Sequence, residues 1–409
     1  MRSAGDGSRR VLVTDAGLGS AISVIRSLGR RGWHVIAADD DPQSPGFRSR
    51  YATERLRYPP PDTDPDRVAD LLLRAARNRR VDLLIPVTDQ VLLPLSAARS
   101  RVPAHCRVAM PDERGVATTH DKAATFELAR SLGVPIPRTR AVDGVPDALR
   151  AAAELGWPVV VKPTVSRSYR PDRPIESFAV EYASGPAELS RLVQEFEGGT
   201  AILLQEYLRG EAHGVELLMD EGRPLAAFQH RRLREVPVTG GASSFRESVA
   251  LDPTLLEHAT RLLGALDWTG LAMVEFKVTA DGPRLMEVNG RIWGSLPLAV
   301  ASGMDFPAKL ADLVCGTGPQ PAGLDTRYRI GIRSRNLELD VLWIASVLSG
   351  RRRRPFLPFP GRWDAISAAA GLFASSDHFD VLSLEDPGPG LAEIAMIASK
   401  MGRKLFAGQ

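Results

Sequence analysis

The sequence predicts an α/β and α+β protein in which a doubly wound parallel-sheet domain precedes two α+β lobes and a C-terminal extension. Three observations support this fold class. The 409 residues exceed the length at which a single hydrophobic core usually stops growing. Short apolar strands alternate with helical segments up to about residue 110, as in parallel sheets. From about residue 112 the pattern changes to helices and strands that two small antiparallel lobes would account for.

These observations divide the chain into four expected parts. An N-terminal Rossmann-like domain spans residues 1–112, and a small lobe with a lid spans 113–200. A large lobe follows over 201–319, and residues 320–409 form an extension without an assigned role.

The N-terminal part reads as two strand–helix units. Strands are expected at 11–13, 35–38 and 81–87, with helices at 21–32 and 67–79. A glycine turn, Asp15–Gly19, follows the first strand, and Asp39 ends the second, which outlines a dinucleotide site. The match is partial because Ala21 and Ile22 stand where a third glycine would. The alternative is that the turn offers its N–H groups to an anionic substrate.

The remaining elements are expected from apolar periodicity, Gly and Pro. His120-Asp121-Lys122 opens a helix through 132, and an extended linker follows at Val134–Pro137. Further helices are expected at 146–155, 186–196, 253–266 and 337–348, and strands at 159–162, 201–204, 215–219, 225–230, 272–278 and 284–288. Trp343 and Val347 lie four residues apart, so they share a helical face that is expected to pack against the large lobe.

Composition excludes several classes of protein. A formal charge of +3, with basic residues spread along the chain, argues against nucleic-acid binding. Two cysteines make neither a disulfide framework nor a zinc site, and no apolar run reaches the ~20 residues of a membrane span. The N-terminus runs into a strand rather than the apolar core of a signal peptide, so we expect a cytoplasmic protein. An arginine run at 351–354 is expected to be a solvated turn, with anionic lipid or an acidic partner as the alternative.

Two adjacent segments carry the strongest functional signal. Met273–Lys277 and Leu285–Arg291 both read as strands, joined through Gly282-Pro283 into a hairpin. Because side chains alternate along a strand, Glu275, Glu287 and Asn289 are expected on one face. Two carboxylates and an amide oxygen form a hard-oxygen site, which Mg²⁺ favours beside substrate phosphates. An exposed polar hairpin face is the alternative.

Lysine is scarce, which draws attention to the few that occur. Only six of the 52 basic residues are lysines. Among them, Lys122 follows His120-Asp121, and Lys162 directly follows Val159–Val161. A lysine ammonium is a compact charge suited to phosphate oxygens.

Taken with Lys122, Lys162 and the segment Gln205–Leu208, this hairpin resembles the ATP-grasp superfamily, nearest to its carboxylate–amine ligases and carbamoyl-phosphate synthetase-like branch. The resemblance covers about residues 10–315. It implies that Lys122 and Lys162 reach the nucleotide phosphates, with Lys162 and Arg291 acting on the transferring phosphoryl group. It also implies that Glu275, Glu287 and Asn289 hold Mg²⁺, or Mn²⁺. The ATP-binding residues it implies are Lys122, Lys162, Gln205, Glu206, Tyr207, Leu208 and Glu211, with Glu216 and His213 as alternatives to Glu211.

The sequence departs from that family in its lid and leaves the substrates open. Residues 164–173, after Lys162-Pro163, contain no glycine, where the family usually has a flexible glycine-rich loop. The basic segment at 229–248 is expected to line the substrate end, with His230, Arg232 and Arg246 as tentative contacts for an anionic group.

The expected function is an ADP-forming ligase that activates a small-molecule carboxylate as an acyl phosphate for attack by an amine. Phosphorylation of bicarbonate or carbamate is one alternative, and a non-catalytic nucleotide-binding protein is another. A homodimer is the default expectation for a soluble enzyme.

Overall fold

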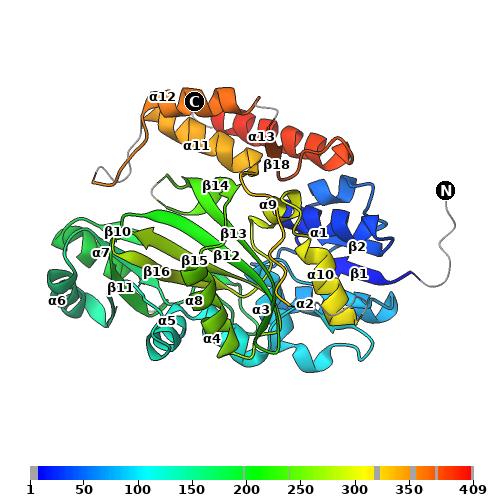
Figure 1. Ribbon diagram of the computed structural model, residues 1–409, viewed down its shortest axis with the longest axis horizontal. Helices are drawn as coiled ribbons and strands as arrows, with labels where there is room; N and C mark the ends of the chain where they lie inside the picture. The colour runs from blue at the N-terminus through cyan, green and yellow to red at the C-terminus, as the bar shows by residue number, and fades with distance from the viewer. Residues whose placement is uncertain are drawn as a thin grey trace.

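The computed structural model describes residues 8–196, 199–238, 240–316, 323–350, 356–373 and 376–406. The N-terminal domain occupies one end of the molecule and the small lobe the other, with a long twisted sheet between them (Figure 1). The C-terminal helices form a layer over that sheet.

The N-terminal domain is a doubly wound sheet, as expected. Its five parallel strands are arranged in the order β3-β2-β1-β4-β5. The alternate residues Val11 and Val13 face α1 (Gly19–Arg30), whereas Leu12 packs with α2 (Pro65–Asn78) and α3 (Asp89–Ala97) on the opposite face. The strands are β1 (Arg10–Val13), β2 (His34–Asp39), β3 (Glu54–Arg57), β4 (Leu83–Ile85) and β5 (Arg107–Val108).

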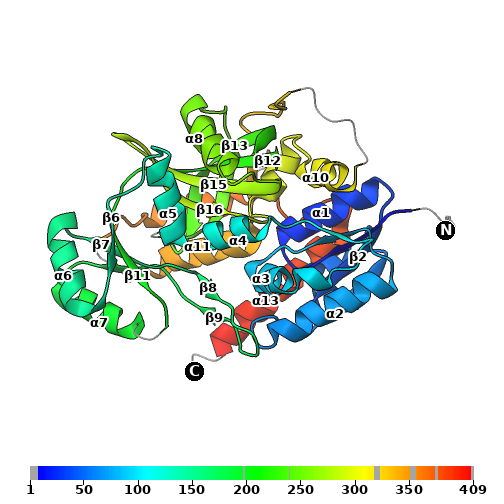
Figure 2. The same ribbon diagram turned by 90° about the horizontal axis from the view of Figure 1, so that it is seen from below.

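The small lobe is a four-stranded antiparallel sheet in the order β10-β7-β11-β6. The apolar faces of α6 (Gly144–Leu155) and α7 (Pro186–Phe196) bury one side of it. Its strands are β6 (Thr139–Val142), β7 (Val159–Pro163), β10 (Glu181–Ala183) and β11 (Ile202–Glu206). The short pair β8 (Arg167–Ser168) and β9 (Glu176–Ser177) extends from this lobe toward the N-terminal domain (Figure 2).

Two helices join the N-terminal domain to the small lobe. They are α4 (Glu113–His120) and α5 (Lys122–Ser131). The Asp121 carboxylate accepts the backbone N–H groups of Ala123 and Ala124, which otherwise lack partners at a helix start. This cap fixes where α5 begins and so places Lys122 in its first turn.

The large sheet has seven strands in the order β16-β15-β12-β13-β14-β17-β18. Helix α8 (Pro253–Gly264) packs on its outer face against apolar residues such as Val215 and Val274. The strands are β12 (Glu211–Asp220), β13 (Arg223–Val236), β14 (Ala242–Ser248), β15 (Gly270–Thr279), β16 (Gly282–Asn289), β17 (Arg333–Arg335) and β18 (Asp377–Phe379).

The C-terminal residues do not form a separate extension, because they complete this sheet. β17 pairs antiparallel with β14, and β18 pairs parallel with β17. The boundary expected at residue 319 therefore divides one hydrogen-bonded sheet. The helices of this region are α11 (Leu337–Ser349), α12 (Arg362–Gly371) and α13 (Pro387–Phe406). Trp343 and Val347 are buried beside Val236 and Val238 at the end of β13, so the expected packing against the large lobe is confirmed.

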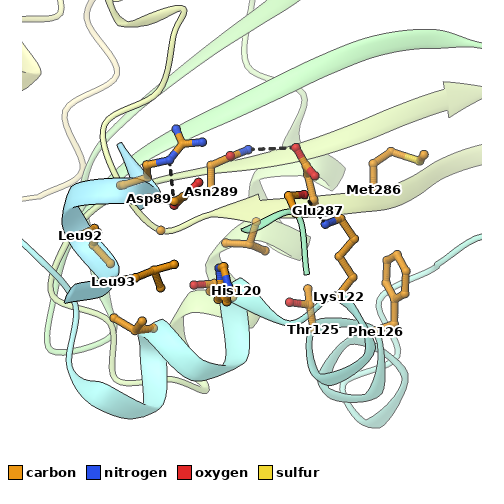
Figure 3. A pocket seen from close by; sticks show the side chains of 16 residues that line it. Asp89, Leu92, Leu93, His120, Lys122, Thr125, Phe126, Met286, Glu287 and Asn289 are labelled. Carbon is orange, nitrogen blue, oxygen red and sulfur yellow. Dashed lines mark hydrogen bonds and ion pairs between the residues drawn. The ribbon is translucent and has the colours of Figure 1, made fainter. Parts of the chain in front are cut away.

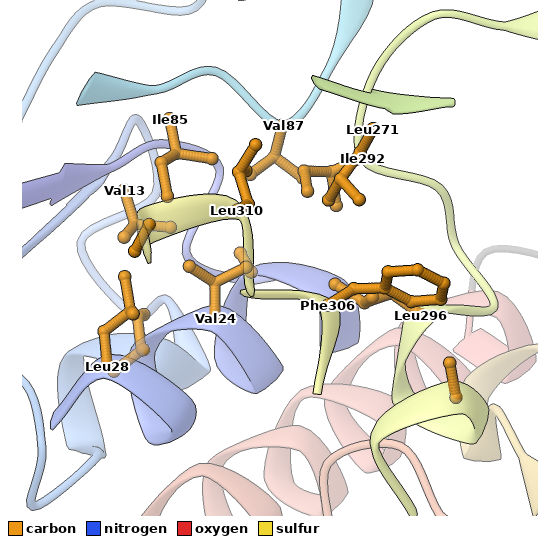
Figure 4. Packing of buried hydrophobic residues seen from close by; sticks show 14 of the residues in the cluster. Val13, Val24, Leu28, Ile85, Val87, Leu271, Ile292, Leu296, Phe306 and Leu310 are labelled. Atoms are coloured by element: carbon orange, nitrogen blue, oxygen red, sulfur yellow. The ribbon is translucent and has the colours of Figure 1, made fainter. Parts of the chain in front are cut away.

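A shared hydrophobic core joins the N-terminal domain to the large sheet. After β16 the chain returns to the N-terminal sheet through α9 (Leu296–Ala301) and α10 (Phe306–Cys315). Phe306 and Leu310 of α10 pack with Val13 and Leu28 on one side and with Leu271 on the other (Figure 4). Burial of this cluster holds the two parts in a fixed orientation, and the candidate site lies between them.

Candidate active site

The β15–β16 hairpin brings Glu275, Glu287 and Asn289 together. Glu275 lies directly opposite Glu287, and a register shift follows between Glu275 and Phe276. The Asn289 amide nitrogen is 3.1 Å from one oxygen of Glu275 and 3.4 Å from one of Glu287. The turn is made by Ala280 and Asp281, and Pro283 lies inside β16 rather than in the turn.

The two carboxylates differ in protonation. Burial raises the pKa of Glu275 to about 7, Arg232 opposes this shift, and the charge of Glu287 adds to it. Burial would also raise the pKa of Glu287, but Lys122, Lys162 and Arg232 outweigh that effect and lower it. Glu287 is therefore the member of the pair that keeps its negative charge.

Lys122 and Lys162 converge on this hairpin from two different elements. Lys122 starts α5 and donates to the Ser166 hydroxyl at 2.8 Å. Lys162 is the next-to-last residue of β7, and its ammonium lies 5.9 Å from the ring centre of Phe126. Both side chains are buried. Burial, followed by the charge of Lys122, lowers the pKa of Lys162 to about 8 although Glu287 opposes the shift. Two desolvated ammonium groups facing a carboxylate form a site for a polyanion with a metal ion.

Lys122, Glu287 and Asn289 line a cavity of about 120 Å³ between the N-terminal domain and the two lobes, whereas Lys162 and Glu275 are not among its lining residues. Its walls carry Lys122, Glu287 and Asn289 on one side and Asp89 with Leu92 and Leu93 of α3 on the other (Figure 3). The volume lies below the ~300–1,000 Å³ of most ligand pockets. A nucleotide would therefore need the walls to move apart.

Arg291 lines the same cavity and is held from the N-terminal domain. Its Nε atom is 3.0 Å from an oxygen of Asp89, and its Nη1 donates to the Ile292 carbonyl at 2.9 Å. Asp89 is the first residue of α3, directly after the N-cap residue Thr88 and four residues past the end of β4 at Ile85. No role for Asp89 was predicted from the sequence, and its place beyond the carboxyl end of the strand expected at 81–87 was the available signal.

Arg232 lies beside the carboxylates of the β15–β16 hairpin, and its side chain is largely buried. Its guanidinium contacts Glu275 and is 3.1 Å from an oxygen of Glu235, and it donates to the Gly241 carbonyl at 3.2 Å. His230 shares the strand face, as alternation predicts, but it is fully buried. Its Nδ1 atom lies 3.0 Å from Glu216. Burial raises the pKa of Glu216 and lowers that of His230, so we describe them as two neutral groups and not as an ion pair.

Arg246, the third tentative substrate contact, has its counter-charge within the protein. It is 1% exposed and donates to both carboxylate oxygens of Asp380 at 2.6 Å. Ser334 donates to the same carboxylate at 2.6 Å. The tentative assignment is corrected here: Arg246 is an internal ion-pair partner, because the C-terminal segment brings Asp380 onto it.

The expected adenine segment lies at the end of β11. The Glu206 backbone N–H donates to the Arg138 carbonyl at 3.0 Å, and its carboxylate accepts from the Arg138 backbone and Nε at 2.8 and 2.7 Å. The Gln205 amide donates to Thr139 at 3.0 Å. The side chains of Gln205 and Glu206 are therefore already hydrogen-bonded within the protein. Tyr207 and Leu208 follow the last residue of β11 that pairs with β7, so it is their backbone groups that offer the expected adenine edge.

The expected ribose partner, Glu211, is exposed at the start of β12. It lies 3.4 Å from His213 and 3.7 Å from Arg231. Of the two alternatives, Glu216 is fully buried and cannot reach a ribose hydroxyl without rearrangement.

The glycine-free loop after Lys162 lies over the cavity. The His120 ring is 2.7 Å from the Arg167 carbonyl, and the Asp172 backbone N–H donates to Asp66 of α2 at 2.7 Å. Tyr169 also donates its hydroxyl to Asp66. In this loop, side-chain groups such as the Ser166 hydroxyl thus take the place where a glycine-rich loop would offer backbone N–H groups. His120 and Ser166 are further cavity residues that the sequence did not identify as contacts.

The N-terminal glycine turn is closed on itself. The Gly17 N–H donates to the Asp39 carboxylate at 2.6 Å, and the Ser44 hydroxyl donates to it at 2.9 Å. The N–H group that a phosphate would use in a dinucleotide site is therefore taken by Asp39.

The oxygen ligands of the hairpin fit Mg²⁺ when phosphate oxygens and water complete its shell. Among the described residues, no three His, Cys, Asp or Glu side chains converge as a metal site. Glu275, Glu287 and Asn289 supply two carboxylates and one amide oxygen, and the neighbouring lysines would hold phosphates. Mg²⁺ commonly takes one or two carboxylates and completes its shell with phosphates and water.

The fold of this chain is similar to that of ATP-grasp proteins. Residues 199–336 match the family described as ATP-grasp in the biosynthetic pathway with Ter operon. Among solved structures, the biotin carboxylase domain of Hydrogenobacter thermophilus 2-oxoglutarate carboxylase, in complex with MgADP, ADP and bicarbonate, aligns with a TM-score of 0.64. It is 17% identical, over 80% of this chain and 73% of that one. N5-carboxyaminoimidazole synthetase from Staphylococcus aureus aligns with a TM-score of 0.59 at 12% identity, over 76% of this chain and 79% of that one.

A curated relative is the large chain of carbamoyl phosphate synthase from Thermus thermophilus. It is 24% identical over 307 residues, which are 72% of this chain but only 28% of the relative. The chain thus spans little more than a quarter of that protein. Among the described residues, no helix has the length and apolar character needed to cross a membrane.

Proposed function

We propose that the protein is an ADP-forming ligase that uses Mg-ATP to activate a substrate carboxylate as an acyl phosphate, which an amine then attacks. The observation that carries this proposal is the convergence of Lys122, Glu287 and Asn289 on one cavity between the lobes. The buried ammonium of Lys162 lies near enough for its charge to lower the pKa of Glu287. These groups supply charge and metal ligands for phosphoryl transfer, and this chemistry needs no side-chain nucleophile.

In the proposed reaction, a carboxylate oxygen of the acid attacks the γ-phosphorus and the bond to the β-phosphate oxygen breaks, releasing ADP. The amine nitrogen then attacks the carbonyl carbon, the C–O bond to phosphate breaks, and the nitrogen loses a proton. Glu275, Glu287 and Asn289 would hold Mg²⁺, which neutralises phosphate charge when bound. Mn²⁺ offers the same ligand chemistry.

The protein's own residues would position the polyanion in this step. Lys122 and Lys162 deliver positive charge from α5 and β7, and Arg291 completes the ring of cations at the cavity wall. To reach a phosphoryl group, Arg291 would exchange its contact with Asp89 for one with phosphate. Tyr207 and Leu208 are proposed to contact adenine, and Glu211 a ribose hydroxyl.

The test is nucleotide product analysis with acids and amines supplied in pairs. We expect ADP and phosphate to form in step with ligated product, and hydroxylamine to trap the acyl phosphate as a hydroxamate. Formation of AMP and pyrophosphate would refute the acyl-phosphate mechanism. Glu287→Gln should lower ADP formation by more than about 100-fold, because it removes the charged metal ligand. Glu127→Gln, at an exposed position on α5, is the matched control.

A second candidate is phosphorylation of bicarbonate or carbamate. It is favoured by the similarity to carbamoyl phosphate synthase and to a carboxylase domain solved with bicarbonate. ATP turnover that requires bicarbonate, and no organic acid, would select this reaction. A non-catalytic nucleotide-binding role is less consistent with a site that retains both Glu275 and Glu287 together with both buried lysines. A homodimer stays a prediction.

A further inference from the structure

A further cavity lies between the outer helices and the large sheet, and we call it the α12 cavity. Its volume of about 780 Å³ falls in the ~300–1,000 Å³ range of most small-molecule sites. The ends of β13, β14, β17 and β18 form one wall, and α11, α12 and the segment before α12 form the other. In Figure 1, α11 and α12 lie above the β13–β14 end of the sheet. None of the described residues that line it also lines the cavity at Lys122 and Glu287, so the two are separate.

Part of the lining is aromatic. Trp343 of α11 and Phe245 of β14 are buried side chains that border the cavity, and Phe359 borders it from the segment before α12. Flat rings pack well against another ring, in stacked or edge-to-face arrangements. The remaining apolar lining residues are Leu233, Val238, Pro358, Pro360 and Ala368. The cavity therefore offers an aromatic ligand apolar contacts from both walls.

Three arginines border the same cavity from the sheet. The guanidinium carbon of Arg234 lies 4.5 Å from the ring centre of Phe245 and 5.1 Å from that of Trp343. The guanidinium carbon of Arg335 lies 3.9 Å from the Phe245 ring centre. The third arginine, Arg333, is half-exposed. Positive charge therefore lies directly beside the aromatic part of the lining.

Arg234 has to share its counter-charge. Arg234 and Arg335 donate to the same oxygen, Oδ2 of Asp340, at 2.8 Å each. Burial lowers the pKa of Arg234, Asp340 opposes the shift, and the charge of Arg335 adds to it. The Nε atom of Arg234 is also buried and has no hydrogen-bond partner among the described residues. An anionic group in the cavity would supply additional counter-charge.

Asp377 adds an acceptor to the lining. Its Oδ2 accepts two N–H groups of Arg335, at 2.9 and 2.6 Å. Its Oδ1 has no hydrogen-bond partner in the part of the chain that the structure describes, although the side chain is only 3% exposed. A buried acceptor without a donor costs stability, and an N–H or O–H group of a ligand would satisfy it. The other acidic lining residue, Asp364, is exposed and accepts the Gly361 N–H at 2.8 Å.

We propose that the α12 cavity binds a small aromatic acid that carries an N–H or O–H group. Its ring would pack against Trp343 and Phe359, its carboxylate would face the arginines, and its N–H or O–H group would donate to Asp377. Charge selects an acid over an amine, because an ammonium group would be placed beside three guanidinium groups. The ligand would bridge α12 and the large sheet, so its binding should also raise the melting temperature.

The test is isothermal titration calorimetry of the full chain with three compounds that share an indole ring. Indoleacetate carries a carboxylate, indoleacetamide is neutral and tryptamine is a cation. We expect indoleacetate to bind at least about tenfold tighter than either of the others, because its end group is the anion. Naphthaleneacetate keeps the charge and lacks the N–H group, so it should bind more weakly than indoleacetate by about threefold or more.

Two substitutions test where the ligand binds. Ser367→Trp places a large side chain in the cavity from an exposed position of α12, so the affinity for indoleacetate should fall by about tenfold or more. Ile366→Trp is the matched control, at a 48% exposed position that does not line the cavity, and it should bind as wild type. Arg333→Gln removes a half-exposed cation and leaves Glu247 paired with Arg231, and it should weaken binding by about threefold.

The outcomes decide for or against the proposal. Tightest binding of tryptamine, equal affinity for the acid and its amide, or no binding of any compound would overturn it. So would wild-type affinity in both Ser367→Trp and Arg333→Gln, or an equal loss in Ile366→Trp, since the ligand would then lie elsewhere. Equal binding of naphthaleneacetate would refute the contact with Asp377. If Ser367→Trp melts more than about 5 °C below wild type, Arg333→Gln alone decides where the ligand binds.

Discussion

Asp380→Asn tests how the C-terminal segment is fastened to the large sheet. The substitution keeps the size of the side chain and removes its charge. Asp380 and Arg246 are each 1% exposed at the side chain, and two 2.6 Å contacts join them. The variant therefore leaves a guanidinium buried without a counter-charge. Breaking a buried pair in this way costs about 3–5 kcal/mol, or roughly two to four powers of ten in the folding equilibrium.

The assay is urea denaturation followed by tryptophan fluorescence, with the midpoint and slope compared among variants. Ser334→Ala removes one hydrogen bond to the same carboxylate and should cost about 1 kcal/mol. Arg246→Met with Asp380→Leu replaces both charges by apolar groups and should recover most of the loss. Arg191→Gln, which breaks an exposed pair with Glu195 on α7, should change stability by less than about 1 kcal/mol. A loss below about 1 kcal/mol in Asp380→Asn, or a double variant as unstable as the single one, would refute the reasoning.

Three further predictions concern charge in other places. The Lys162 ammonium has a pKa of about 8, so it loses its charge as the pH rises above that value, and ATP affinity should then fall by up to about tenfold per pH unit. Lys162→Arg should flatten this dependence in calorimetric titrations, and an identical profile for both proteins would contradict the assignment. Burial, with Asp380 and Glu338 nearby, raises the pKa of Glu393 to about 8, so its ionisation in the unfolded state removes stability as the pH climbs from about 4.5 to 8. Glu393→Gln should therefore raise the melting temperature at pH 7 by a few degrees and have little effect near pH 4, and the opposite trend would disprove this view. Arg138→Met releases the Glu206 carboxylate, so the KM for ATP should change by about threefold or more with kcat nearly constant, whereas a change confined to kcat would exclude a role at the adenine edge.

Local pattern was sufficient for the parts of the site built by one hairpin. Alternation along two adjacent strands predicted that Glu275, Glu287 and Asn289 share a face, and the register in the structure agrees. The same holds for His230 and Arg232. Alternation does not indicate how deeply a side chain is buried, however. It therefore could not predict that His230 is fully buried while Arg232 contacts Glu275.

The remaining contacts depend on pairings between distant segments, which local sequence does not encode. Arg291 meets Asp89 across the interface of the N-terminal domain, and Arg246 meets Asp380 from the end of the chain. Each pair forms only after whole domains have packed. The C-terminal strands were missed for a related reason: β17 and β18 are three residues long each, too short to show a periodic signal.

The contacts of the lid with Asp66 have a kinetic consequence. Asp66 belongs to α2, and the neighbouring Asp62 carbonyl accepts the Ile175 backbone N–H at 2.8 Å. If the cavity binds ATP as proposed, exchange of ADP for ATP would require these distant bonds to break, although neither Asp62 nor Asp66 lines the cavity. Turnover would then be limited by how long the loop stays attached to α2, and Asp66→Ala should accelerate product release without altering the phosphoryl-transfer groups. Under the proposed function, the N-terminal domain would set how long the nucleotide stays bound to the protein.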